Sequence, residues 1–230
     1  MGTLVNAASI LVGSGLGLWL AGPLARRHQE SLIRAVGLAV LVIGARMALG
    51  GQNLPLIIIG LAAGTIMGEE ARLEHRLEEF GRVLGTRFSR GHGDFLRGFL
   101  TATLVYCVGA MAIMGALEDG LTGSYTILLA KSALDGITAV VFASTMGLGV
   151  AFSAIPVLLY QGTITLLART VEPLLTPGTI ADMTATGGLL IIGIGLNLLG
   201  VTRLRLANML PSVVVVAILV RVAEVLTSGL

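Results

Sequence analysis

Apolar runs of membrane-spanning length follow one another along almost the whole chain. A helix needs about 20 residues to cross a hydrocarbon core roughly 30 Å thick. Runs near that length lie at 3–22, 32–50, 54–69, 97–117, 124–145, 147–168, 184–201 and 207–226. Lipid supplies no hydrogen bonds to the backbone, so these runs predict an all-α integral membrane protein with about eight transmembrane helices. The short glycine turn between the fifth and sixth runs leaves a seven-span alternative open.

The composition excludes several other classes of protein. Only 12% of the 230 residues are charged and 55% are hydrophobic, whereas about a quarter of the residues in soluble domains are charged. The net charge of +2 does not indicate a nucleic-acid partner, because the arginines are scattered in short segments between apolar runs. The chain has one cysteine, Cys107, and no zinc-ligand spacing, phosphate-binding loop or nucleophile beside paired carboxylates. We therefore expect no enzymatic activity, no catalytic residues, no metal and no cofactor.

The distribution of arginine predicts the orientation in the membrane. Short cytoplasmic loops of bacterial inner-membrane proteins are rich in Lys and Arg. With the N-terminus outside, the cytoplasmic segments contain eleven arginines and the outer segments contain two, Arg169 and Arg221. We expect both termini outside the bacterial inner membrane, and we read the N-terminal apolar run as a retained span.

Residues 70–96 form the one sizeable hydrophilic segment and predict a cytoplasmic amphipathic helix followed by a linker. Its apolar positions recur at helical spacing, at Leu73, Leu77, Phe80 and Leu84. Such a helix either packs on the bundle and membrane boundary or docks a cytoplasmic partner.

The first and last thirds of the sequence resemble each other. Gly37 and Gly44 align with Gly188 and Gly195, and Pro55 then aligns with Pro211 after a longer loop. At the starts of the two copies, Met1, Gly2, Val5 and Ile10 align with Met146, Gly147, Val150 and Ile155. Five spans separate these starts, so the second copy enters the membrane in the opposite sense. An inverted repeat of spans 1–3 and 6–8 is typical of secondary transporters.

This repeat divides the single membrane domain into four parts. Repeat 1 covers residues 1–69, the cytoplasmic helix and linker cover 70–96, two intervening spans cover 97–145, and repeat 2 covers 146–230.

Two charges lie inside the fifth apolar run. Lys131, the only lysine, and Asp135 are one helical turn apart, and Thr138 continues the same face. A charge at bilayer depth costs roughly 2.5–3.5 kcal/mol on insertion scales, so such groups pair or face protein or water. The pair either clamps neighbouring helices together or takes part in transport or ion coupling.

Other polar side chains inside the apolar runs are candidates for the same pathway. Asn6, Gln161 and Asn197 lie in the first, sixth and seventh runs, and Gln161 follows Pro156, where a kink would expose backbone carbonyls. Arg46 aligns with Asn197 in the repeat and either snorkels to the outer boundary or lines a pathway.

Four segments together resemble a known family. They are YCVGAMAIMGALEDGL (106–121), KSALDG (131–136), FASTMGLGVAFSAIP (142–156) and GLLIIGIGLNLLG (188–200). With the N-terminal GTLVN, they resemble the YdfK and YqgA-like family of bacterial inner-membrane proteins, a domain of unknown function. The resemblance covers nearly the whole chain. It implies a polytopic inner-membrane protein and supplies neither a substrate nor site residues.

These observations favour a secondary transporter of a small solute or ion, which works by alternating access around a midplane site. The expected site residues are Lys131, Asp135, Thr138, Gln161, Asn6 and Asn197. The expected partners are the lipid bilayer, the solute and a second copy of the chain in a homodimer. A membrane scaffold or sensor that signals through residues 70–90, or a channel, is the alternative.

Overall fold

The computed structural model describes residues 1–21, 29–76, 79 and 92–228. All regular structure in these residues is helical. The main helices are α1 (Gly2–Leu20), α3 (Gln29–Ala48), α4 (Leu54–Glu70), α6 (His92–Cys107), α7 (Ala110–Thr122), α8 (Thr126–Met146), α10 (Ala154–Leu166), α12 (Pro177–Leu198) and α13 (Pro211–Ser228). Short helices lie between them: α9 (Gly149–Phe152), α11 (Ala168–Val171), η1 (Glu172–Leu174) and η2 (Leu206–Met209).

The predicted all-α membrane fold is confirmed at this level. Within the described residues, six helices or helix pairs are long and apolar enough to cross a membrane, and a seventh span results if α6 and α7 count as one. The count of eight is not confirmed. It would need α4, whose 17 residues correspond to about 25 Å of helix and lie at the short end of the spanning range.

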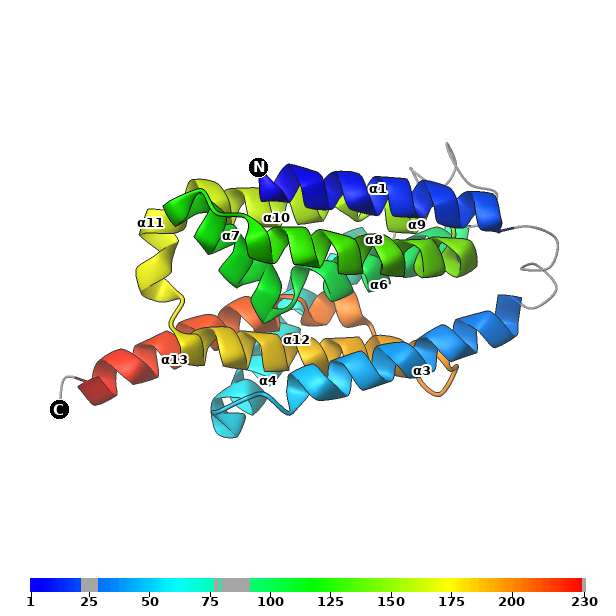
Figure 1. Ribbon diagram of the computed structural model, residues 1–230. Coiled ribbons are helices and arrows are strands. Elements are labelled where there is room, and N and C mark those ends of the chain that lie inside the picture. Colours follow the sequence, from blue (N-terminus) through cyan, green and yellow to red (C-terminus); the bar gives the residue numbers. More distant parts are fainter. Residues whose placement is uncertain (22–28, 77–78, 80–91, 229–230) are drawn as a thin grey trace.

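The helices form two groups that lie one above the other in Figure 1. One group contains α1, α8, α9 and α10, and the other contains α3, α4, α12 and α13. α6 joins the groups, because it packs against α8, α9 and α10 on one side and against α12 on the other. The N-terminus and the end of α13 lie at the same end of the bundle (Figure 1).

Glycines allow the helices to pack closely within each group. A Cβ atom at Gly44 would lie 2.7 Å from the carbonyl oxygen of Gly188, and one at Gly188 would lie 2.7 Å from that of Gly44. Gly37 and Gly195 face each other in the same way, at 3.3 and 3.0 Å. α3 and α12 therefore meet backbone to backbone along their lengths, as small residues at membrane helix interfaces permit.

One of the predicted spans is a broken helix. The span predicted at 97–117 bends by 59° between α6 and α7, and Gly109 at the bend has φ 154°, a conformation that side-chain-bearing residues rarely adopt. The span predicted at 147–168 contains α9 and α10, which meet at Ser153 in a helical conformation and together form one span, Gly149–Leu166. Pro156 lies in the first turn of α10, where its missing N–H leaves no helical bond unmade.

The predicted cytoplasmic helix lies largely outside the described residues. α4 ends at Glu70, and beyond it the described chain continues to residue 76 and includes residue 79. In this part, the backbone N–H of Glu74 donates a 2.8 Å hydrogen bond to the side chain of Asn208. The segment is therefore fastened at its start to η2, the short helix before α13.

Candidate functional site

The two charges of the fifth span form a buried ion pair on α8. Lys131 Nζ lies 2.9 Å from Asp135 Oδ1 and 2.6 Å from Asp135 Oδ2, and each side chain is only 8% exposed. The i,i+4 spacing on a helix brings the two groups together without help from another element. Lys131 Nζ also lies 6.0 Å from the ring centre of the fully buried Tyr106, at the edge of cation–π range.

Two amides from other helices extend this pair into a polar cluster. Asn6 on α1 donates through Nδ2 to Asp135 Oδ2 at 3.0 Å and to Gln161 Oε1 on α10 at 3.2 Å. Both amides are fully buried. The sequence prediction that Asn6, Lys131, Asp135 and Gln161 lie together therefore agrees with the structure, which joins three helices at this point. We call these four residues the polar cluster.

The polar cluster retains unused hydrogen-bonding capacity. In the described part of the chain, Asn6 Oδ1 and Gln161 Nε2 are buried and have no partner. One is an acceptor and the other a donor. Since buried polar groups are nearly always satisfied, this complementary pair is suited to a bound water or a small polar ligand.

A large cavity reaches the ion pair from between the two helix groups. Its volume is about 1140 Å³, and both Lys131 and Asp135 line it. The cavity extends to Gly50 after α3 and to Pro177 at the start of α12. It is larger than the 300–1,000 Å³ typical of small-molecule pockets. We call it the large cavity.

The walls of the large cavity combine apolar surface with a few charges. Arg46 on α3, Glu118 on α7 and Glu172 in η1 line it together with the ion pair. Gly109 and Ala110 at the start of α7 also line it, and the N-terminus of a helix carries a partial positive charge. A broken helix whose end faces a cavity is the arrangement that transporters use to bind ions and polar groups.

Two of the predicted site residues add no side-chain group to the polar cluster. The Thr138 hydroxyl donates to the backbone oxygens of Leu134 and Asp135 on its own helix, so the continuation of the polar face at i+7 does not add a ligand group to the cluster. Asn197 lies near the far end of α12 and makes hydrogen bonds to Leu204 and Thr202. Its position in an apolar run suggested a buried group, but it holds a loop at the helix end.

Asp182 is a buried carboxylate that the sequence analysis did not select. Its side chain is fully buried and accepts hydrogen bonds from the backbone N–H groups of Gln52 and Asn53 at 2.6 and 3.1 Å and from Asn53 Nδ2 at 2.9 Å. α12 begins at Pro177, seven residues before the predicted span, so Asp182 was placed outside the membrane. Its role is to fix the connection between α3 and α4.

Comparison with known proteins agrees with the resemblance seen in the sequence. The family described as "Protein of unknown function (DUF554)" matches residues 1–221. This chain belongs to that family. No solved structure matches the chain.

Two curated relatives cover nearly the whole DUF554 chain. It is 34% identical over 220 residues to an uncharacterized membrane protein, YdfK, from Bacillus subtilis, with 93% of each chain covered. It is 33% identical over 217 residues to the uncharacterized protein YqgA from Escherichia coli, with 92% of each covered. YdfK is described as a membrane protein, and neither relative supplies an activity.

Proposed function

We propose that this DUF554 protein is a secondary transporter of a small solute or ion in the bacterial inner membrane, which works by alternating access around the polar cluster. The observation that carries the proposal is the large cavity of about 1140 Å³, which reaches a buried ion pair whose neighbouring amides, Asn6 and Gln161, each keep one buried atom without a partner. A pair that only clamps helices needs neither a cavity nor unused hydrogen-bonding atoms. Asp135 is the tenth of the 21 residues of α8, which is close to midplane depth for a helix that spans the bilayer.

The glycine contacts between α3 and α12 support the inverted repeat. In the sequence alignment Gly37 corresponds to Gly188, and Gly44 corresponds to Gly195. In space Gly37 faces Gly195, and Gly44 faces Gly188. The first glycine of each copy therefore faces the second glycine of the other copy. A two-fold axis between the copies produces this reciprocal pattern. Such an axis passes midway along both helices.

The α4 and α13 helices give the same pattern. Pro55 corresponds to Pro211, so Gly60 corresponds to Val216, and a Cβ atom at Gly60 would contact Val216 itself. A position that meets its own counterpart lies on the axis. Two helix pairs thus favour one in-plane axis, as expected for inverted-topology repeats.

The repeat also relates the two ends of the molecule. Ile194, Asn197 and Leu198 on α12 line a smaller pocket of about 580 Å³. In the repeat alignment, where α3 and α12 are 151 residues apart, these residues correspond to Ile43, Arg46 and Met47 on α3. All three line the large cavity. Pro177 lines the large cavity and Leu198 lines the smaller pocket, and these two residues lie at opposite ends of the 22-residue α12. Corresponding surfaces therefore line pockets at opposite ends, with the large cavity reaching the polar cluster.

This relation suggests how the opposite state would form. Exchange of the two copies' conformations would close the large cavity and extend the smaller pocket along α6 toward Tyr106 and Lys131. Leu104 on α6, which is 2% exposed, lies between the smaller pocket and Tyr106 along that helix. In the proposed cycle Leu104 becomes accessible only in the opposite state.

The proposal includes eight membrane spans, both termini on the outer side of the inner membrane, and a homodimer. Eight spans require α4 and the α6–α7 pair each to cross once, and they place both termini on one side. The homodimer follows from the small size of a 230-residue bundle.

Cysteine accessibility tests the cycle. In a Cys107→Ala background, Met114→Cys, at a 47% exposed residue that lines the large cavity, reports the outer opening, and Leu104→Cys reports the inner one. A membrane-impermeant maleimide is applied to right-side-out and inside-out vesicles. We expect Met114→Cys to react from one side and Leu104→Cys to react slowly from the other. A bulky adduct at Met114→Cys should suppress the reaction at Leu104→Cys.

Other outcomes contradict the proposal. Both positions reacting from the same side at once would indicate a channel. If Leu104→Cys stays unreactive from both sides while a denatured control reacts, the bundle is static and the transporter proposal fails. Uptake by proteoliposomes, measured against a panel of small anions, cations and polar solutes, then identifies the substrate.

A further inference from the structure

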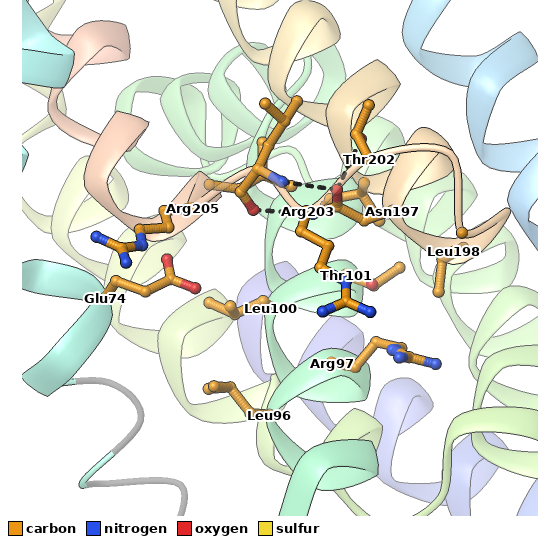
Figure 2. Close-up of a pocket in the computed structure, with 14 residues that line it drawn as sticks. Glu74, Leu96, Arg97, Leu100, Thr101, Asn197, Leu198, Thr202, Arg203 and Arg205 are labelled. Atoms are coloured by element: carbon orange, nitrogen blue, oxygen red, sulfur yellow. Dashed lines mark hydrogen bonds between the residues drawn. The ribbon is translucent and has the colours of Figure 1, made fainter.

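The smaller pocket lies at the end of α12 away from the large cavity. Its volume is about 580 Å³, and α6, α12, the loop before η2 and Glu74 supply its walls. This volume is within the usual range of small-molecule sites. Figure 2 shows the side chains that line it.

Three arginines converge on this pocket. Arg97 comes from α6, and Arg203 and Arg205 come from the loop that follows α12. In Figure 2, Arg203 extends from the loop toward α6, where Arg97 and Thr101 lie. Among the described residues none of the three guanidinium groups has an ion pair or a hydrogen bond. All three residues are exposed, so water screens their mutual repulsion and their guanidinium groups are free to bind an anion that enters the pocket.

Among the described residues that line the pocket, Glu74 is the one acidic side chain, and it is already engaged. Glu74 Oε2 accepts a 2.9 Å hydrogen bond from the backbone N–H of Ala207. Counting Arg97, Arg203 and Arg205 as +3 and Glu74 as −1, the described lining residues have a formal charge of +2. This excess matches a phosphate dianion.

The loop that carries two of the arginines is held in place by Asn197. The side-chain Nδ2 donates to the backbone oxygen of Leu204 at 2.9 Å, and Oδ1 accepts from the Leu204 N–H and from the Thr202 hydroxyl, each at 2.9 Å. These three bonds fix the backbone on both sides of Arg203. A preorganised guanidinium loses less entropy when it binds an oxyanion.

Thr101 gives a second observation that points to a ligand. The residue is 1% exposed and lines the pocket. Within the part of the chain that the structure describes, its hydroxyl forms no hydrogen bond. Because this hydroxyl borders the pocket and lies beside guanidinium groups, it can donate to an oxyanion.

We propose that Arg97, Arg203, Arg205 and Thr101 form a binding site for a phosphate group, with Asn197 as the positioning residue. Guanidinium groups bind phosphate oxygens in a bidentate manner, which lysine cannot reproduce. The phosphate belongs either to a soluble anion or to the headgroup of an anionic lipid. The site is separate from the polar cluster, and it does not depend on the transport proposal.

The experiment uses the purified full-length chain, so orientation in the membrane does not affect the result. Inorganic phosphate is titrated at constant ionic strength into protein in phosphatidylcholine nanodiscs, and binding is measured by calorimetry. Lipid binding is measured in parallel by native mass spectrometry after exchange into phosphatidylglycerol. Arg203→Gln is the main variant. Arg203→Lys retains the positive charge but lacks the planar guanidinium group that binds two phosphate oxygens at once. Arg169→Gln, at an exposed arginine outside the pocket, is the matched control.

We expect Arg203→Gln to weaken binding about tenfold or more, because a hydrogen bond to a charged group is lost. Arg203→Lys should weaken it by less, and Arg169→Gln should leave it unchanged. Asn197→Ala should weaken binding while it leaves the thermal stability largely intact. Loss of phosphate binding identifies a soluble anion, and loss of phosphatidylglycerol binding alone identifies a lipid headgroup. If neither probe binds, or if Arg203→Gln and Arg169→Gln behave alike, the site does not exist and the arginines serve only topology.

Discussion

The amide of Asn6 donates a 3.0 Å hydrogen bond to the carboxylate of Asp135, and this bond joins α1 to α8 where the ion pair is buried. Asp135 therefore accepts from a lysine on its own helix and from an amide on another. The same Asn6 amide continues to Gln161 on α10. One carboxylate thus couples the ion pair to the relative positions of three helices. A change in its hydrogen bonds would alter the contacts among all three.

Substitution of Asp135 separates a working site from a clamp. Asp135→Asn leaves the Lys131 charge buried without a counterion, which costs about 3–5 kcal/mol. We expect a marked fall in thermal stability, measured in detergent, and loss of solute uptake in proteoliposomes. Thr138→Val is the control, because the Thr138 hydroxyl donates to the backbone of its own helix and not to the polar cluster, and it should change neither property.

The double variant Lys131→Met/Asp135→Leu distinguishes the two roles. Replacing a whole buried ion pair by apolar residues is often neutral or stabilising, so the double variant should recover much of the stability that Asp135→Asn loses. Under the transport proposal its uptake stays absent. A double variant that is both stable and active would show that the pair is only a clamp.

The close packing of α3 on α12 predicts that alanine is tolerated less well at Gly44, in this contact, than at Gly15 on α1, which serves as the control. In Gly44→Ala the new methyl group would lie 2.7 Å from the Gly188 carbonyl oxygen, so the helices must separate and stability should fall. At Gly15 nothing lies within 4 Å of the added atom, and alanine is favoured over glycine in a helix by about 1 kcal/mol. Gly15→Ala should therefore be neutral or stabilising in a thermal unfolding assay. Equal effects at the two positions would contradict the packing.

Much of the fold follows from physical rules that operate locally. Eight apolar runs coincide with helices or broken helices because lipid demands internal backbone hydrogen bonds at every such run. Lys131 and Asp135 are also predictable as a pair, since four residues in a helix bring them onto one face. The kink predicted at Pro156 is not confirmed, because Pro156 lies in the first turn of α10 and Gly149–Leu166 forms one span.

Other features depend on contacts that a single sequence does not encode visibly. Asn6 and Gln161 were candidates individually, but their meeting depends on the packing of α1 against α10. Asn197 also lies in an apolar run, so nothing in the sequence separates it from Asn6 and Gln161. In the structure it lies where α12 ends and a polar loop begins. Asp182 was missed because the carboxylate interacts with backbone groups 130 residues away, for which no motif exists.

A double-mutant cycle measures the role of Asp182. Asp182→Ala removes three hydrogen bonds to Gln52 and Asn53, and Asn53→Ala removes one of them. Bonds to a charged group contribute about 1.5–3 kcal/mol each, so Asp182→Ala should destabilise the protein more than Asn53→Ala. The two effects should be non-additive by about 0.5–3 kcal/mol. Additive effects in thermal unfolding would show that the contact between the two side chains contributes nothing.

The location of both termini at one end of the bundle (Figure 1) gives a direct test of orientation. Arginine is abundant in the segments at the opposite end, where Arg97, Arg203 and Arg205 line the smaller pocket, and cytoplasmic loops retain such charges. A C-terminal alkaline phosphatase fusion should therefore be active, and a C-terminal green fluorescent protein fusion should be dark. A fusion after Arg203 gives the matched internal control and should show the reverse. A fluorescent C-terminal fusion would place the arginine-lined pocket outside the cell, and it would overturn the proposed direction of both openings.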